Sequence, residues 1–189
     1  MEREILLTGI GGQGVQLAAQ VIARAALHAG HHVMSLGTYG GSMRGGDTRS
    51  TVIVGSEPIS SPPIVSSSWG GLGSHPRNWE GVRSKLRPDG LAVWDTDLFD
   101  EETVPKGVHG VPVPATSMAS SLGAPQAASL VLVGALAGAS GLVGIEALVA
   151  AMREALPSYR QQHVPKNSEA LRAGFAAAPS GIAPAWDEA

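Results

Sequence analysis

Residues 4–14 of the chain have the sequence EILLTGIGGQG, and this stretch decides the fold class. The apolar run Glu4–Thr8 is typical of a buried strand, and Gly9–Gly14 matches the anion-binding pattern G-x-G-x-x-G. Apolar residues then recur at helical spacing from Val15 to Ala29, and His32–Leu36 has the pattern of a second strand. We therefore predict an α/β fold that begins with a strand–helix–strand unit, whose two strands are parallel with a right-handed crossover.

The glycines of this first turn have distinct predicted roles. Gly9 permits the tight turn, Gly11 lets a phosphate approach the backbone, and Gly14 lets the helix pack closely on the strand. The free amides of the first helical turn would then face an anion, and Gln13 would add a polar group on the outer side of the loop. The alternative is a turn that only allows the helix to pack.

The acidic residue that a dinucleotide site requires is missing. Such a site has an Asp or Glu at the end of the second strand, which holds the ribose hydroxyls. Here that strand ends at Met34–Gly37, and no acidic residue occurs between Glu4 and Asp47. Arg44, the first arginine that could hold the extra phosphate of NADP, lies well into the next loop. We therefore expect no working NAD(P) site in this chain.

A second glycine-rich loop follows the second strand. Residues 37–46 contain five glycines together with Tyr39 and Arg44. Because parallel strands end at the same edge of a sheet, both loops should emerge side by side, and Arg44 would supply a positive charge with bidentate geometry. We predict an anion-binding or partner-facing site that consists of Gly9, Gly11, Gly12, Gln13, Gly14, Tyr39, Arg44, Gly45 and Gly46.

The remaining pattern predicts further strands and helices without an internal repeat. Strands are expected at Arg49–Val54, Leu91–Trp94 and Val108–Val113, and helices at Thr116–Leu122, Gln126–Ala139, Gly144–Leu156 and from Asn167 or Ser168 to just before Pro179. The helix at 126–139 is apolar on all faces, so we expect it to be buried in the core or under a partner.

Composition narrows the class of protein. Charged residues make up 15% of the 189 residues, against about 25% in a typical soluble domain. This low charge indicates either large contacts with other proteins or a genome that favours Ala and Gly. The net charge of −3 argues against a general nucleic-acid binder. No apolar stretch reaches the roughly 20 residues of a membrane span, so we expect a cytoplasmic protein without a membrane partner.

The sequence lacks the residues of most self-contained chemistry. It contains no cysteine, which excludes disulfides, thiolate zinc sites, a cysteine nucleophile and cysteine-ligated iron–sulfur clusters. Of its six histidines only His28 and His32 have H-x-x-x-H spacing, and the predicted end of the helix at Gly30 separates these two. No G-x-S-x-G nucleophile elbow occurs. We therefore expect neither a catalytic residue nor a metal site in this chain.

Several stretches resemble, in order, the gamma subunit of 2-oxoacid:acceptor oxidoreductases. This family comprises the pyruvate, 2-oxoisovalerate, 2-oxoglutarate and indolepyruvate:ferredoxin oxidoreductases. The resemblance extends to about Ala178. The stretches that carry it are the turn Gly9–Gly14, Tyr39-Gly40 with Arg44–Gly46 and the strand after them, Pro58–Pro62, Leu86–Asp95, Gly123–Gly138 and Asn167–Gly174.

This resemblance implies a fold and a role. The fold would be a single Rossmann-like domain over residues 1–178, with a mostly parallel sheet flanked by helices, followed by a flexible tail over residues 179–189. The chain would be the non-catalytic gamma subunit of an oxidoreductase complex, inactive on its own, that decarboxylates a 2-oxoacid oxidatively to its acyl-CoA.

The same resemblance implies cofactors and partners. No cofactor is expected on this chain alone. Thiamine diphosphate, Mg and the iron–sulfur clusters would lie on the other subunits, and coenzyme A would take the acyl group. The partners would be alpha and beta subunits, a ferredoxin-like delta subunit, and indirectly ferredoxin or another acceptor.

Two other functions stay open at this point, and one segment departs from the family. The first alternative is a freestanding nucleotide- or anion-binding regulatory module, and the second is an NAD(P)-dependent reductase. The departure is residues 64–79, where the family has an apolar strand and a short helix but this chain is rich in Ser and Gly. The local fold of this segment is therefore open.

Overall fold

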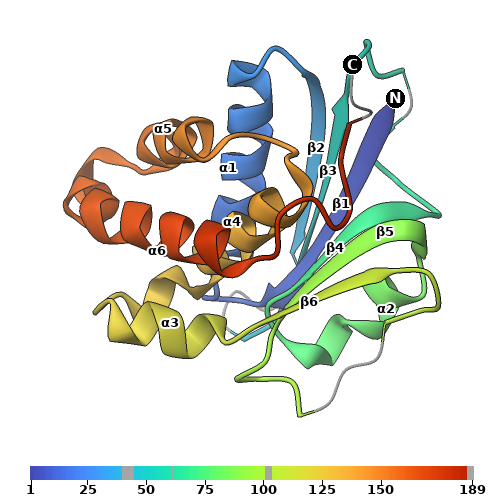
Figure 1. Ribbon diagram of the computed structural model, residues 1–189. Coiled ribbons are helices and arrows are strands. Elements are labelled where there is room, and N and C mark those ends of the chain that lie inside the picture. The colour runs from blue at the N-terminus through green and yellow to red at the C-terminus, as the bar shows by residue number, and fades with distance from the viewer. Residues whose placement is uncertain (40–44, 61, 101–103, 187–189) are drawn as a thin grey trace.

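The computed structural model is an α/β fold built on one six-stranded sheet (Figure 1), and it describes residues 1–39, 45–60, 62–100 and 104–186. The strand order is β2-β3-β1-β4-β5-β6. The strands are β1 (Glu2–Ile10), β2 (His32–Tyr39), β3 (Asp47–Gly55), β4 (Ser68–Gly73), β5 (Leu86–Asp95) and β6 (His109–Val113). The helices are α1 (Val15–His28), α2 (Glu80–Arg83), α3 (Ala115–Ser121), α4 (Ala128–Ser140), α5 (Ile145–Ala155) and α6 (Val164–Ala177), with 3-10 turns η1 (Pro76–Asn78), η2 (Pro125–Ala127) and η3 (Ser158–His163).

The sheet is mostly parallel, as expected, but the first two strands do not pair. Strands β1, β4, β5 and β6 form a parallel set, whereas β3 lies antiparallel between β1 and β2. The first two strands are parallel to each other, as predicted, but β3 separates them in the sheet. The reason is that β3 follows the second glycine loop directly, so it turns back and pairs with both strands along its length.

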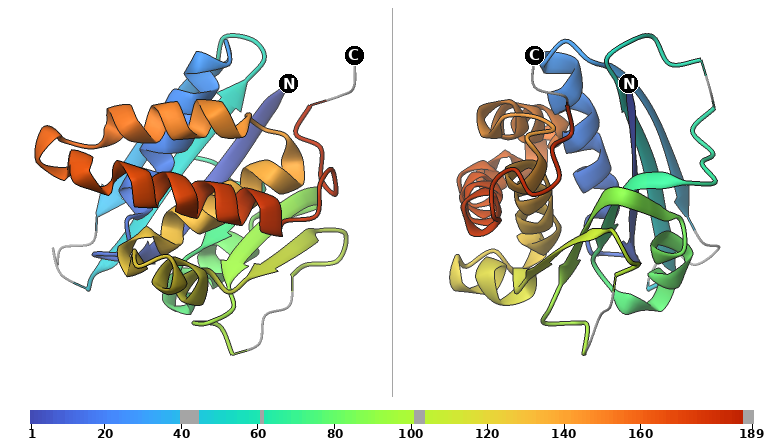
Figure 2. Two further views of the ribbon diagram at one scale, coloured as in Figure 1. Left: turned by 60° about the vertical axis from the view of Figure 1, so that its left-hand side comes forward. Right: turned by 45° about the vertical axis from the view of Figure 1, so that its right-hand side comes forward.

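Helices α1, α3 and α4 pack on one face of the sheet, α5 and α6 lie outside them, and α2 lies against the other face (Figure 2). The apolar helix α4 contacts β4, β5 and β6 on one side and α6 on the other, and its residues from Ser129 to Ala137 are all buried. The expected burial of this helix is therefore achieved within the chain, and its cover is α6 rather than a partner. A side chain at Gly174 of α6 would lie 1.9 Å from the Val131 carbonyl oxygen, so the two helices touch backbone to backbone.

The segment that departs from the family still forms a strand and a short helix. Residues 68–73 make β4, which is buried along its whole length, and η1 follows. The ring of Trp79 occupies the space beside the glycines of this strand. A Cβ at Gly71 or Gly73 would lie 3.2 or 2.8 Å from that ring. Trp79 thereby joins Leu6, Trp94 and neighbouring apolar residues in a second, smaller core under α2.

The last described residues of the chain pack against the rest of the fold. Ala183 and Ala185 are buried, and Trp186 stacks on His31 at 4.4 Å between ring centroids while its ring nitrogen donates to the Leu142 carbonyl at 3.0 Å. Ala183, Ala185 and Trp186 therefore pack against the rest of the fold. The flexible tail over 179–189 stays a prediction, and residues 187–189 lie outside the described residues.

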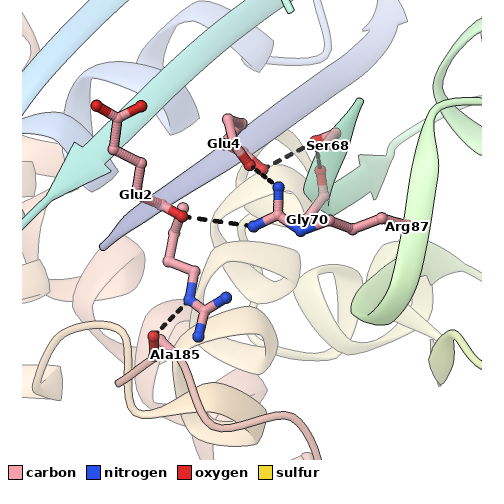
Figure 3. Close-up of polar contacts among 7 residues, drawn as sticks. Glu2, Glu4, Ser68, Gly70, Arg87 and Ala185 are labelled. Carbon is pink, nitrogen blue, oxygen red and sulfur yellow. Dashed lines mark hydrogen bonds and ion pairs between the residues drawn. The ribbon is translucent and has the colours of Figure 1, made fainter. Parts of the chain in front are cut away.

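Polar contacts tie this C-terminal segment and β5 to the amino end of β1 (Figure 3). The guanidinium of Arg3 donates to the Ala185 carbonyl, and Arg87 forms an ion pair with Glu4. The Ser68 hydroxyl donates to the Glu4 carbonyl at 2.8 Å. This end of the sheet is therefore closed by the chain itself, and the opposite, carboxyl end is where a site can form.

Helix α6 begins earlier than predicted. Its first residue is Val164, three residues before the predicted start, and Pro165 lies in its first turn, where a missing N–H costs no hydrogen bond. Asn167 consequently lies inside the helix instead of capping it. Within the described ranges, no helix is long and apolar enough to cross a membrane.

Candidate functional site

The two glycine loops meet at the carboxyl end of the sheet. The Gly11 amide donates to the Gly46 carbonyl at 2.8 Å, so the turn after β1 touches the loop that precedes β3. They share this edge because β1 and β2 point the same way, although the two strands are not neighbours. Residues 40–44, including Arg44, and the side chain of Tyr39 lie outside the described residues.

The first turn leaves the start of α1 open. Gly12 and Gly14 have φ of 101° and 78°, a region that glycine adopts without strain. Gly14 is the N-cap residue of α1, and no side chain among the described residues caps this helix, so its first amides are available there. A Cβ at Gly14 would lie 2.8 Å from the Ser129 hydroxyl of α4. The prediction was a close approach of the helix to the strand at Gly14. The structure shows the close approach to α4 instead.

Gln13 closes the turn instead of facing outward. Its carbonyl oxygen accepts from the Ile10 amide at 2.9 Å, and its amide nitrogen donates to the Ser74 carbonyl at 3.0 Å. The oxygen and the nitrogen of this side chain both form hydrogen bonds that join the end of β1 to the end of β4. The Gly11 amide already donates to the Gly46 carbonyl. The expectation of an outward-facing Gln13 is therefore wrong, and Gly12, with open space around its Cβ position, is the exposed part of the turn.

A small pocket of about 140 Å³ lies between the turn and the ends of β4 and β5. It is lined by Gly12, Gln13, Ser74, Asp95, Thr116, Pro125, Gln126, Ala128, Ser129 and Leu132. Asp95 is 1% exposed, and its carboxylate accepts from the Ala115 amide at 2.9 Å and the Thr116 hydroxyl at 2.6 Å. This carboxylate holds the start of α3, so its charge is already offset by helix amides.

A larger pocket of about 450 Å³ lies on the other side of the same turn. It is lined by Gly12, Gly14, Leu17, Gln126, Leu130, Leu156, Arg160, His163 and Asn167. Sequence reasoning missed the contributions of η3 and α6, which are about 150 residues away along the chain. The available signal was Asn167 itself, which opens one of the family-like stretches but was interpreted there as a helix cap.

The titratable groups whose pKa is shifted lie away from both pockets. Burial, and then the neighbouring His32, lower the pKa of His31, while an ion pair lowers the pKa of Glu146 and raises that of Arg172. All three groups lie outside the two pockets. In the described parts of the chain, no cluster of three His, Asp or Glu side chains could hold a metal ion.

Comparisons with known proteins give one consistent family. The family model described as pyruvate ferredoxin/flavodoxin oxidoreductase matches residues 4–177. The 2-oxoglutarate synthase subunit KorC of Methanocaldococcus jannaschii is 29% identical over 178 residues, which are 93% of each chain. The pyruvate synthase subunit PorC of Methanothermobacter marburgensis is 31% identical over 179 residues, 91% of this chain and 95% of the relative.

Solved structures agree with the sequence comparisons. The gamma subunit of a keto/oxoacid ferredoxin oxidoreductase from Geobacter sulfurreducens superposes with a TM-score of 0.76 at 26% identity, covering 93% of this chain and 98% of that one. A 2-oxoglutarate:ferredoxin oxidoreductase from Magnetococcus marinus matches with a TM-score of 0.82 at 22% identity. The match covers 94% of this chain but 31% of the Magnetococcus marinus chain, so the same fold also occurs as a part of a longer polypeptide.

Proposed function

The chain belongs to the pyruvate ferredoxin/flavodoxin oxidoreductase family, and from this premise we propose that it is the gamma-type subunit of a 2-oxoacid:ferredoxin oxidoreductase. The observation that carries the proposal is the match in length. Relatives about 30% identical over more than nine-tenths of both chains are subunits of oxidoreductases that act on 2-oxoacids. The matches cover more than nine-tenths of the length of each of these subunits.

The proposed division of labour follows from the side chains present. A chain without cysteine cannot supply the thiolates that hold iron–sulfur clusters, so the clusters belong to other subunits in this proposal, together with thiamine diphosphate and Mg. The partners would be alpha and beta subunits and a ferredoxin-like delta subunit. The chain itself would contribute a binding surface and no reacting group.

We place that surface at the carboxyl end of the sheet, around Gly12. The start of α1, which no side chain of the described residues caps, presents backbone amides and the positive end of the helix dipole, and Gly12 lets an anion approach them closely. A phosphate of coenzyme A fits these donors, and so does a carboxylate from a partner subunit. Arg44 and Tyr39 stay predicted members of this site.

The two alternative functions receive less support. In a dinucleotide-binding fold the end of the second strand lies beside the glycine turn and holds the ribose. Here β3 lies between β1 and β2, so the end of β2 is one strand further away, and it carries no acidic side chain. An NAD(P)-dependent reductase is therefore disfavoured. A freestanding regulatory module is disfavoured by the full-length match to subunits of complexes.

Assembly and activity test this proposal together. A tagged chain should co-purify with thiamine-diphosphate-binding subunits encoded beside it, and the complex should reduce a low-potential acceptor with a 2-oxoacid and coenzyme A. Mass spectrometry identifies the partners. A chain that purifies alone from its native cells, and whose deletion leaves that activity intact, would overturn the assignment.

A matched pair of substitutions locates the surface. Gly12→Asp places a carboxylate in front of the α1 amides, whereas Gly30→Asp introduces the same residue at another glycine with positive φ and open space. Gly12→Asp should weaken assembly or the apparent affinity for coenzyme A at least about tenfold, which corresponds to about 1.4 kcal/mol. Gly30→Asp should lose similar thermal stability and change neither readout. If the two variants showed the same assembly and the same apparent affinity for coenzyme A, the proposed surface would not include Gly12.

A further inference from the structure

Strand β2 forms one edge of the sheet. In the described structure it pairs with β3 on one side only, and residues 35–38 are exposed. Proteins usually protect such an edge with charged side chains, proline or a bulge, because its free backbone groups are a template for another strand. In β2, residues 33–38 carry no ionisable side chain and no proline, and the register with β3 runs without a bulge from His32 to Tyr39. This edge is therefore ready to pair.

The opposite edge of the sheet is protected. Strand β6 has five residues, His109–Val113, and contains Pro112, which has no backbone N–H to offer to a neighbouring strand. Strand β2 offers eight regular residues instead. The difference between the two edges indicates that β2 is the edge at which another strand is added.

The two faces of β2 differ in how far they are covered. Val33 packs against the main core, and a Cβ at Gly37 would run into the Gln16 side chain of α1, so these residues face the helices. Side chains alternate along a strand, so Met34 and Leu36 face the other side, where α2 packs on β1, β4 and β5. Leu36 is 39% exposed there, and a further strand beside β2 would cover it.

A strand that pairs with this edge has to suit its lack of charge. A partner strand with a net charge gains no electrostatic attraction from residues 33–38. A second copy of β2 suits the edge better, because a strand without charges does not repel itself, whereas like charges directly opposite each other destabilise a sheet. In an antiparallel pair related by a two-fold axis, the outward N–H groups of each copy meet the outward C=O groups of the other.

The faces of β2 limit which residues can lie opposite each other. A two-fold axis perpendicular to the sheet keeps the helices of both copies on one side of the joined sheet, and directly opposite residues share a face. An axis through Leu36 satisfies this rule and brings the two copies of this exposed side chain together. Met34 then lies opposite Thr38, and Ser35 lies opposite Gly37, on the same faces as in the single chain.

We infer that two copies of this chain associate through β2 and join their six-stranded sheets into one. The low content of charged residues, 15%, predicted large contacts with other proteins, but the apolar helix α4 is covered by α6 of the same chain. The uncharged edge at β2 is a surface that remains for such a contact. The inference goes beyond the proposed function and does not rest on it, because every group named belongs to this chain.

Sedimentation of the full chain over a series of concentrations tests the inference. The wild type should dimerise, and Leu36→Lys should raise the dissociation constant of the dimer at least about tenfold, because it places two like charges opposite each other. Ile64→Lys is the matched control, since it introduces lysine at another apolar residue, which is 79% exposed, and it should dimerise like the wild type. Both variants should keep the circular dichroism spectrum of the wild type. A wild type that is monomeric at every concentration, or a folded Leu36→Lys variant that dimerises normally, would overturn the inference.

A mixture of two variants tests the position of the axis. Leu36→Glu should also fail to dimerise, because it too places like charges opposite each other. An equimolar mixture of Leu36→Glu and Leu36→Lys should form heterodimers, since opposite charges then meet across the axis. A mixture that stays monomeric would overturn the pairing of the two copies at Leu36.

Amide hydrogen exchange of the wild type distinguishes strand pairing from contact through side chains, and it needs no substitution. Those amides of residues 33–38 that face away from β3 should exchange more slowly at high than at low concentration, because they become hydrogen-bonded in the dimer. The amides of β6 should exchange at the same rate at both concentrations. Unchanged exchange in β2 would overturn the inference. Protection of β2 in a complex that holds a single copy of the chain would assign the edge to a strand of another subunit and would also overturn it, while leaving the subunit assignment to its own co-purification test.

Discussion

Replacing Gly174 with alanine tests the packing that holds the pocket in place. In most helix interiors this change stabilises, because alanine is favoured over glycine by about 0.5–1 kcal/mol. Here the new Cβ would lie 1.9 Å from the carbonyl oxygen and 2.7 Å from the carbonyl carbon of Val131 in α4. Ordinary contact begins near 3.4 Å, so α6 must move away by more than 1 Å.

The magnitude follows from what has to move. The atoms in the way belong to the backbone of a buried helix, which cannot turn aside as the end of a flexible side chain can. Overpacking of this kind costs about 1–3 kcal/mol, and we expect the upper part of that range. After the helix propensity of alanine is subtracted, the loss is about 2 kcal/mol. For a chain of this length that lowers Tm by about 4–8 °C.

Thermal unfolding followed by circular dichroism measures this loss, and Gly81→Ala is the matched control. Gly81 also lies in a helix, but a Cβ there would meet only the guanidinium of Arg49 at 3.8 Å. Gly81→Ala should therefore leave Tm unchanged or raise it. If Gly174→Ala melted at or above the wild type, as the control should, the backbone contact between α4 and α6 would not exist as described.

Three further predictions concern single side chains. Asp95→Ala leaves two amides at the start of α3 without their acceptor and should cost about 2 kcal/mol in urea unfolding, with a smaller loss for Asp95→Asn; equal losses would contradict a role of the charge. Since burial and then His32 lower the pKa of His31, the unfolded chain takes up a proton first, so stability should fall as pH falls below about 6.5 and be fully present above it; His31→Gln should flatten this dependence, and an unchanged slope would assign it to other groups. Gly9→Ala places a Cβ 2.8 Å from the Gln13 side-chain carbonyl oxygen, and should displace that side chain and lower Tm. An unchanged Tm would contradict the close contact between Gly9 and Gln13.

Some features of this protein were determined by the sequence alone because their causes are local. The glycine turn follows from an apolar run that ends in closely spaced glycines, and the start of α1 follows from helical spacing after it. The burial of α4 followed from a stretch that is apolar on all faces. The absence of cysteine excludes a cysteine-ligated iron–sulfur cluster on this chain. None of these conclusions needs to know which strands are neighbours.

The tertiary structure alone decided the neighbours, and with them the site. Hydrophobic alternation predicts that β3 is a strand but carries no information on its direction, so its position between β1 and β2 could not be foreseen. The inward position of Gln13 could not be foreseen, because its partner, the Ser74 carbonyl, lies 61 residues away along the chain. Asn167 and Gly12 belong to one pocket only because α6 packs on α4 and α4 packs on the first turn. Such contacts depend on which surfaces fit together across the whole fold, and the periodicity of a single segment does not specify them.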